Sequence, residues 1–469
     1  LLEGFTLNGE FRQGGGILNL IGGGSVETSG SLDVSNSELK LGSSLSITGT
    51  LVVNSGTSWS GLGGTVDLSS GTLESSGGTL SLDRFSTGSN TSFKLSGNTE
   101  ISSSDNLTFG TLDLGGNKLT LAAGSAGLTL PNTLTMDNES SSIETKNANL
   151  TLVQSLSLTS GSITSTGGTL SFAGGVTLGT AGSLEVTGST LGAGQVLDLS
   201  SGTFSSENGS VLDLQSATTL RSNDQDTGQN PVTFKDVHFN GNVLSLGSAS
   251  THLKVDDPLA LTGIALETGA GSLTLSGALA LTDNASLNSS GGTITLVSGA
   301  SASSGTSISL PDTTLVLQSA LAIYSSTLKT KNTTFSTNAN ALILSGSTLE
   351  IEGVQDLIGV FMDNSSTLRL AADSTINDNS TLSVGILELA DNTLTLDDQM
   401  AGMSVTQSVT LDATGEKIVT GAADLTLNGG ITVSAGTLSS SGGILTASSL
   451  SVGDTGIINI EGGTLTLPA

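Results

Sequence analysis

Residues that could take part in chemistry are few and widely separated in this 469-residue sequence. The only histidines are His238 and His252, which lie near Asp236 and the pair Asp256-Asp257. Imidazole and carboxylate groups together can hold a transition metal. No short ligand spacing such as H-x-x-x-H accompanies them. We therefore interpret these residues as polar side chains of an ordinary surface.

The most polar segment of the chain is a second candidate for ion binding. Asn223, Asp224, Asp226 and Gly228 follow one another in it and could supply oxygen ligands to a cation. The regular ligand series and closing Glu of an EF-hand are missing, and so is the glycine-rich calcium repeat of other solenoids. Asp224 and Asp226 are therefore weak calcium candidates beside the simpler interpretation of a solvated loop. Calcium is the one cofactor that the sequence suggests.

An enzyme that cleaves polysaccharides would need paired carboxylates, or Arg and Lys that converge on a reacting group. The only arginines, Arg12, Arg84, Arg221 and Arg369, are scattered along the chain. Aromatic residues on which a sugar could stack are also scarce, with one Trp, one Tyr and 11 Phe. We expect no catalytic residues and no enzymatic activity.

The composition limits the classes of protein to which the chain can belong. The 41 acidic and 13 basic residues give a net charge of −28, which disfavours binding to nucleic acid or to anionic lipid. The lack of Cys excludes disulfides and thiolate metal sites. No apolar run is long enough to span a bilayer as a helix. The chain also differs from a disordered protein, because 35% of its residues are hydrophobic and they recur at fixed spacing.

A short repeated unit runs through the chain and is clearest in Asp424–Val452. The triplets Leu425/Leu427 and Ile431/Val433 each place one polar residue between two apolar ones, which is the period of a β-strand. Gly429-Gly430 supplies the backbone freedom for a tight corner. A unit this short cannot bury its apolar face alone, so it must stack on its neighbours.

Four fuller copies of one phrase confirm the repetition. They are G-T-L-E-S-S-G-G-T-L at Gly71, G-S-I-T-S-T-G-G-T-L at Gly161, A-S-L-N-S-S-G-G-T-I at Ala285 and G-T-L-S-S-S-G-G-I-L at Gly436. The spacing predicts an all-β fold: a parallel β-helix (β-solenoid) with three short strands per coil of about 20–22 residues. We expect residues 1–469 to form a single continuous solenoid, with Leu170 and Leu427 among its inward-facing residues.

Four breaks in the rhythm are the places where a grafted site is expected. The most polar of them is Ser222–Pro231, which contains the calcium candidates. Arg84–Ser92 is predicted to be a polar loop. Val354–Asn364 is apolar and irregular, which suggests a turn of helix against one face of the solenoid. Asp397–Val405 contains two methionines and suggests a packed excursion.

T-x-T triplets provide a further alternative. They occur at Thr133/Thr135, Thr293/Thr295, Thr393/Thr395 and Thr464/Thr466. Outward-facing Thr pairs are found in flat ice-binding solenoids, but Thr is also favoured on any solvated strand face.

The segment Leu425–Leu438, L-T-L-N-G-G-I-T-V-S-A-G-T-L, resembles the repeat in passenger regions of autotransporters and related large bacterial surface proteins. The resemblance extends as a pattern over almost the whole chain, although the Asn-Thr-Tyr turn of those repeats is missing. It implies a right-handed parallel β-helix that is exported and serves in adhesion or as a rigid stalk or surface layer. No functional residue can be carried over from it.

We therefore expect a non-catalytic structural or adhesive protein that is extracellular or on the cell surface, and bacterial: a surface filament, sheath or adhesin stalk. The expected partners are further copies of the chain, by end-to-end or lateral association, or a surface glycan or other cell-surface ligand. The alternative is a polysaccharide-binding or polysaccharide-degrading β-helix protein. Because the sequence opens and closes within the repeat, we expect it to be a segment of a longer or processed protein.

Overall fold

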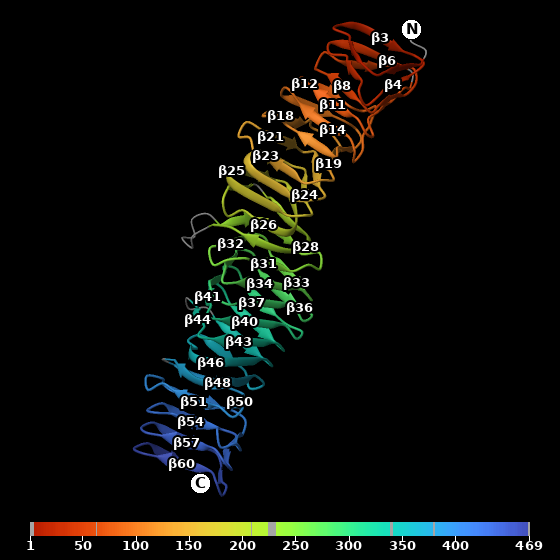
Figure 1. The fold of residues 1–469 in the computed structure, drawn as a ribbon. Helices are drawn as coiled ribbons and strands as arrows, with labels where there is room; N and C mark the ends of the chain where they lie inside the picture. Colours follow the sequence, from red (N-terminus) through yellow and green to blue (C-terminus); the bar gives the residue numbers. More distant parts are fainter. Residues whose placement is uncertain are drawn as a thin grey trace. The chain divides into compact units, whose positions relative to one another are not determined.

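The computed structural model of the chain describes residues 4–61, 63–207, 209–223, 231–337, 341–378 and 380–467. All regular secondary structure in these residues is β-strand, and none of it is helical. The strands pair in parallel with strands one coil away, so the fold is a parallel β-solenoid (Figure 1). Chain contacts divide it into two units. The first comprises the residues up to Asn223 and Val232–Asn242, and the second comprises Pro231 and the residues from Val243 onward.

The first three coils of the first unit each have three strands, and equivalent strands form three separate sheets. The first sheet contains β1 (Phe5–Leu7), β4 (Gly24–Val26), β7 (Leu45–Ile47), β10 (Val66–Asp67) and β13 (Phe85–Ser86). The second contains β2 (Glu10–Arg12), β5 (Ser31–Asp33), β8 (Thr50–Val53), β11 (Thr72–Ser75), β14 (Ser92–Leu95) and β17 (Thr111–Asp113). The third contains β3 (Gly16–Leu20), β6 (Ser37–Leu41) and β9 (Ser58–Ser60).

Further along the first unit, short strands alternate with longer ones, which turn a corner without a break and join neighbouring faces. The strands are β12 (Gly78–Ser81), β15 (Thr99–Ser102), β16 (Leu107–Thr108), β18 (Lys118–Leu121), β19 (Gly127–Leu130), β20 (Leu134–Met136), β21 (Ser142–Lys146), β22 (Asn149–Leu152), β23 (Leu156–Ser165), β24 (Thr169–Phe172), β25 (Val176–Thr187), β26 (Thr190–Asp198), β27 (Thr203–Glu207), β28 (Val211–Arg221), β29 (Val232–Phe234) and β30 (Asp236–His238). β23 and β25, for example, each pair along two successive faces with a shift of register at the corner.

The second unit repeats the arrangement of three strands per coil. One face contains β31 (Leu244–Leu246), β34 (Ala265–Gly269), β37 (Ser286–Ser289), β40 (Ser307–Pro311), β43 (Thr327–Lys331), β46 (Thr348–Asp356), β48 (Thr367–Asn377), β50 (Ile386–Glu388), β51 (Thr393–Leu396), β54 (Lys417–Val419), β57 (Thr437–Ser440) and β60 (Ile457–Ile460). A second sheet contains β32 (His252–Val255), β35 (Ser272–Leu275), β38 (Thr293–Leu296), β41 (Thr314–Leu317) and β44 (Thr334–Ser336).

The remaining strands of the second unit form three shorter sheets. They are β33 (Leu259–Thr262), β36 (Leu279–Thr282), β39 (Ala300–Ala302), β42 (Leu321–Tyr324), β45 (Leu342–Ser345) and β47 (Val360–Met362); then β49 (Thr381–Val384), β52 (Gly402–Val405), β55 (Asp424–Leu427), β58 (Ile444–Ala447) and β61 (Thr464–Thr466); then β53 (Val409–Leu411), β56 (Ile431–Val433) and β59 (Leu450–Val452).

The length of a coil varies around the predicted value. Leu32 pairs with Leu51 across a short coil, and Leu394 pairs with Ile418 across a long one. Most register partners have a separation between these two, as Leu273 and Ile294 do. The fold class and the three-strand coil predicted from the repeat are confirmed.

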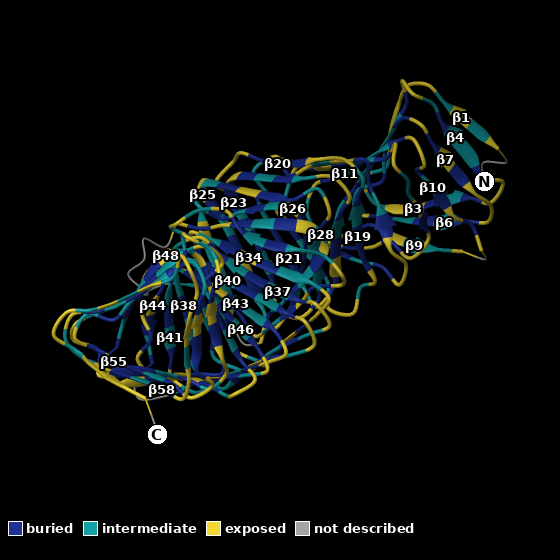
Figure 2. Cartoon of the chain, turned by 90° about the horizontal axis from the view of Figure 1, so that it is seen from below, coloured by how far each residue is buried: buried dark blue, intermediate teal, exposed yellow. Residues whose placement is uncertain are grey.

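The interior of each unit consists of aligned columns of aliphatic residues. In β6, Leu39 and Leu41 are buried, while Glu38 and Lys40 between them face outward. Figure 2 shows the same alternation of buried with intermediate or exposed residues in both units. Each fully buried Leu contributes about 1.5–3 kcal/mol to folding, so the stability of the stack is a sum over neighbouring coils.

The structure corrects the helix expected at Val354–Asn364. β46 continues to Asp356, a turn follows, and β47 covers Val360–Met362 in register with β45. The reason is the alternation of side chains in β47, where two buried residues flank the exposed Phe361. The polar loop expected at Arg84–Ser92 also contains the short strand β13, with Phe85 buried. β52 follows the turn at Asp397, with Met400 and Met403 buried as expected. Most of the fourth break, Ser222–Pro231, lies outside the described residues.

A carboxylate organises the turn that follows β47. The Asp363 side chain accepts hydrogen bonds from the hydroxyls of Ser345 (2.6 Å), Ser365 (2.7 Å) and Ser366 (2.8 Å), and from the backbone N–H of Gly346 (3.2 Å). These donors, the Ser345 hydroxyl first among them, hold the pKa of Asp363 well below its usual range.

We expect Asp363→Asn to lower the free energy of unfolding by about 1–3 kcal/mol at neutral pH, because it removes a charged acceptor from several donors. Asp363 has a lower pKa folded than unfolded, so its contribution is present above the unfolded value and fades as the pH falls below it. Unfolding by urea at neutral and acid pH should show the deficit shrinking in acid. The control is Asp356→Asn, which removes the charge of a carboxylate that accepts one turn hydrogen bond, from Ile358 N; an equal deficit there would contradict the prediction.

Candidate functional site

The two histidines bind different groups and belong to different units. His238 Nε2 lies 3.1 Å from Asp236 Oδ2, and its Nδ1 lies 3.5 Å from Asp213 Oδ1. His252 Nε2 lies 2.9 Å from Thr274 Oγ1. Within the part of the chain that the structure describes, no group of three or more His, Cys, Asp or Glu side chains is arranged to hold a metal ion.

The calcium candidates Asp224 and Asp226, with Gly228, lie outside the described residues. The prediction of a weak calcium site there is untested. It stays a prediction from the sequence.

The T-x-T triplets do not form one surface. Thr133/Thr135 flanks β20 Leu134 in the first unit. In the second unit the other triplets lie on β38, β51 and β61, which belong to three different sheets. A flat ice-binding array needs its triplets stacked on one sheet, so this arrangement does not supply it.

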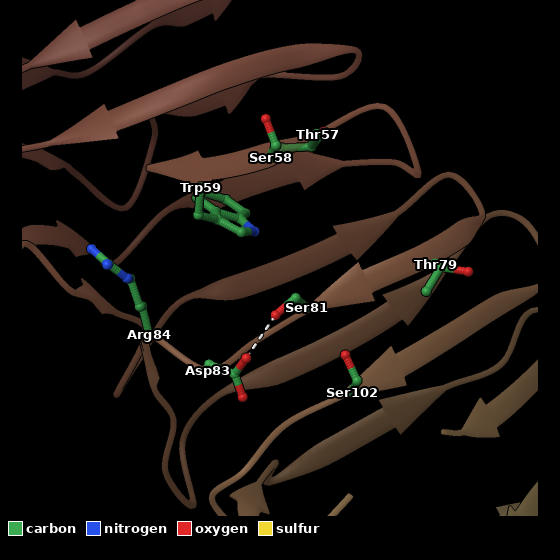
Figure 3. Close-up of a pocket in the computed structure, with 8 residues that line it drawn as sticks. All are labelled: Thr57, Ser58, Trp59, Thr79, Ser81, Asp83, Arg84 and Ser102. Carbon is green, nitrogen blue, oxygen red and sulfur yellow. Dashed lines mark hydrogen bonds between the residues drawn. The ribbon is translucent and has the colours of Figure 1, made fainter. Parts of the chain in front are cut away.

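The feature that sequence reasoning missed is a cavity of about 430 Å³ around the only tryptophan of the chain. Figure 3 shows its lining side chains, which are mostly hydroxyl-bearing. They are Thr57, Ser58, Trp59, Thr79, Ser81, Asp83, Arg84 and Ser102. They come from β9, β12, β15 and the turns next to these strands.

The cavity lies at an interruption of the β-ladder. β9 ends the sheet formed with β3 and β6, and β12 begins a separate sheet with β15, so β9 and β12 are not paired. Trp59 stands in register with Leu39, whose side chain is fully buried. The tryptophan therefore occupies an inward position of the coil, but it is only half-buried because the next strand does not close over it.

Two charged residues lie side by side at the edge of the cavity. The Asp83 carboxylate accepts hydrogen bonds from Ser81 Oγ (2.9 Å, dashed in Figure 3) and from Ser104 N (2.7 Å). The bond from the Ser104 backbone, followed by that from Ser81, lowers the pKa of Asp83. Arg84 Nη1 donates to Gly61 O at 3.1 Å.

The other arginines stand apart from this cavity. Arg12 pairs with Glu10 at 2.5 Å and Arg369 with Glu388 at 2.7 Å, while Arg221 Nη1 lies 3.8 Å from Asp198 Oδ2. These are ordinary surface pairs, each of which contributes little to stability.

A signal for the cavity was present in the sequence. Trp59 interrupts the aliphatic rhythm in S-W-S-G-L-G-G, and Leu80 follows at the inward position of the next coil. The repeat therefore predicts that the residues around position 80 lie next to the tryptophan.

A second cavity, of about 290 Å³, has a different character. Its described lining includes Asp113, Asp137 and Asn138 but no aromatic residue. Asp113 Oδ1 accepts from Gly115 N and Asn138 Oδ1 accepts from Ser140 N. Two of its polar side chains thus stabilise the turns that carry them.

Together these observations define the chain as a parallel β-solenoid with an aromatic and hydroxyl-lined cavity where one ladder is interrupted. Comparison of the sequence with protein-family models and with curated proteins, and of the structure with solved structures, found no match. Among the described residues there is no helix long and apolar enough to cross a membrane.

Proposed function

We propose that the chain is a non-catalytic structural and adhesive solenoid of a bacterial cell surface, related in kind to autotransporter passenger regions. The observation that carries the proposal is the stack of parallel coils in each unit, with an aliphatic interior and an exterior rich in Ser and Thr. In such a stack every coil supports the next, which suits a protein that must persist outside the cell.

We include association with further copies of the chain in this proposal. Within the described part of the chain, β59, β60 and β61 each pair with another strand on one side only. Inward-facing residues of this coil, among them Val452 and Leu465, are 51% and 38% exposed. Open strand edges over an apolar interior recruit further strands, whether these come from a second copy or from more of the same chain.

Electron microscopy of the purified chain, with and without calcium, tests the structural role. We expect unbranched particles of one regular diameter that lengthen by end-to-end association as the protein concentration rises. Loss of this order when calcium is removed would show that the assembly needs calcium. Globular particles of variable diameter, or an unordered aggregate, would contradict the proposal.

The alternative, a protein that acts on polysaccharide, is supported by one observation, the cavity at Trp59. Hydrolysis of a glycosidic bond normally uses two carboxylates at a defined separation. Asp83 is the one carboxylate among the described lining residues. The cavity therefore favours binding of a saccharide over its cleavage.

A further inference from the structure

The gap between β9 and β12 replaces the usual pairing of strands from successive coils with a cavity. In the second sheet of the first unit, successive coils pair from β2 to β17, so that Leu51, Leu73 and Phe93 stand in one continuous column. At β9 and β12 the equivalent pairing is interrupted, and a cavity of about 430 Å³ takes its place. Two strand edges therefore face the cavity, together with the hydroxyls of Ser58 and Thr79.

Trp59 is held in a fixed orientation beside this cavity. Its ring packs edge-on against Phe85, with the ring centroids 4.8 Å apart and an interplanar angle of 83°. Its indole Nε1 is buried and has no hydrogen-bond partner among the described residues. A buried indole N–H normally finds an acceptor, so this donor remains unsatisfied beside the cavity.

Asp83 and Arg84 add a fixed acceptor and a fixed donor. The hydrogen bonds from Ser81 and Ser104 hold the carboxylate in place and keep it ionised at neutral pH, while the bond to Gly61 O anchors the guanidinium. Neither Asp83 nor Arg84 takes part in an ion pair with any residue that the structure describes. Each keeps hydrogen-bonding capacity for a ligand.

We propose that this gap, lined by Trp59, Asp83 and Arg84, is a binding subsite for a neutral polysaccharide. It deepens the adhesive part of the proposed function and rests on it. An aromatic ring packs against the C–H face of a pyranose, and the carboxylate and guanidinium bind its hydroxyls. One acidic and one basic group leave the site without net charge, and the net charge of −28 repels polyanionic glycans.

A peptide strand is the competing occupant, because unpaired strand edges also attract extended peptides. Peptide grooves of that kind provide apolar pockets for alternate side chains. The gap instead presents Ser and Thr hydroxyls, two charged groups and a single ring. These side chains favour the saccharide.

The only tryptophan of the chain makes the test direct, since its fluorescence reports this site alone. The complete chain is titrated with neutral hexasaccharides (cellohexaose, mannohexaose and maltohexaose), with hexagalacturonate, and with an extended peptide of alternating Thr and Val. We expect a saturable change in tryptophan emission with at least one neutral hexasaccharide. We expect Arg84→Ala and Asp83→Asn to weaken that binding about tenfold or more.

Matched variants separate the site from the fold. Asp67→Asn removes the charge of a carboxylate that accepts a hydrogen bond from the turn N–H of Ser69 outside the cavity, and Arg369→Ala removes an arginine of the second unit. Both should bind like the wild type. Trp59→Phe, followed by calorimetry, should bind more weakly and keep a wild-type circular dichroism spectrum.

Three results would overturn the proposal: no emission change with any saccharide, a preference for hexagalacturonate, or a response to the peptide alone. The structural role is judged separately by electron microscopy. If the particles are ordered but no saccharide changes the tryptophan emission, the structural role stands and the subsite proposal is wrong. If a saccharide binds but the chain forms only unordered particles, the subsite stands and the structural role is wrong.

Discussion

Replacing Leu170 by aspartate is expected to destabilise the first unit by about 3–5 kcal/mol, because a carboxylate there would have no partner for its charge. Leu170 is fully buried in β24, in register with Leu150 on one side and Leu191 on the other. Because coils support one another only through their neighbours, the loss should spread to the coils on either side.

Ser171→Asp is the matched control, since it places the same charge one residue further along the strand. Ser171 faces outward and accepts a hydrogen bond of 2.6 Å from Gln215 Nε2, which a carboxylate can also accept. Urea unfolding and hydrogen exchange of both variants measure the difference. Leu427→Asp and Thr426→Asp form an equivalent pair in the second unit. Equal stability of the two variants in either pair would show that the inward assignment is wrong.

Gly110→Val is expected to be the other severe substitution, with a loss of about 3 kcal/mol or more. Gly110 is buried between β16 and β17, and its N–H donates to Thr91 O at 2.8 Å. A Cβ at this position would meet Ser89 O of the preceding coil at 1.9 Å. Since the obstacle is backbone, the new side chain can be accommodated only if the two coils separate.

Gly9→Val tests whether the effect comes from this close approach or from glycine in general. A Cβ on Gly9 meets nothing within 4 Å, so this variant should unfold within about 0.5 kcal/mol of the wild type. Thermal and urea denaturation of the two variants provide the comparison. Similar losses at both positions would contradict the prediction, because the loss would then not come from the close approach to Ser89 O.

The inward and outward faces of the solenoid were determined by the sequence alone. Alternation with a period of two decides which side chains share a face of a strand, and it is written into each short strand. Leu425, Leu427 and Val433 are buried as that alternation predicts. The regular recurrence of these triplets also predicts three strands per coil of about 20–22 residues. Since one such unit cannot bury its apolar face alone, the coils must stack on one another.

At particular positions the structure differs from what the sequence pattern predicts. Val354–Asn364 was read as helix because its apolar residues follow one another closely, yet β46 and β47 continue the ladder through it. Pairing with the neighbouring coil satisfies the backbone there, and that gain outweighs the local pattern. Leu450 and Val452 follow the repeat but are not fully buried, because no further strand of the described chain pairs beyond β59.

Only the tertiary structure decided where one coil fails to pair with the next. By its register with Leu39, Trp59 is an inward residue that the repeat alone assigns to the core. Whether the strand one coil later covers it depends on contacts between segments a whole coil apart, and local alternation carries no information on those contacts. The cavity, and the meeting of Trp59 with Asp83 and Arg84 in it, arise from the unpaired step between β9 and β12.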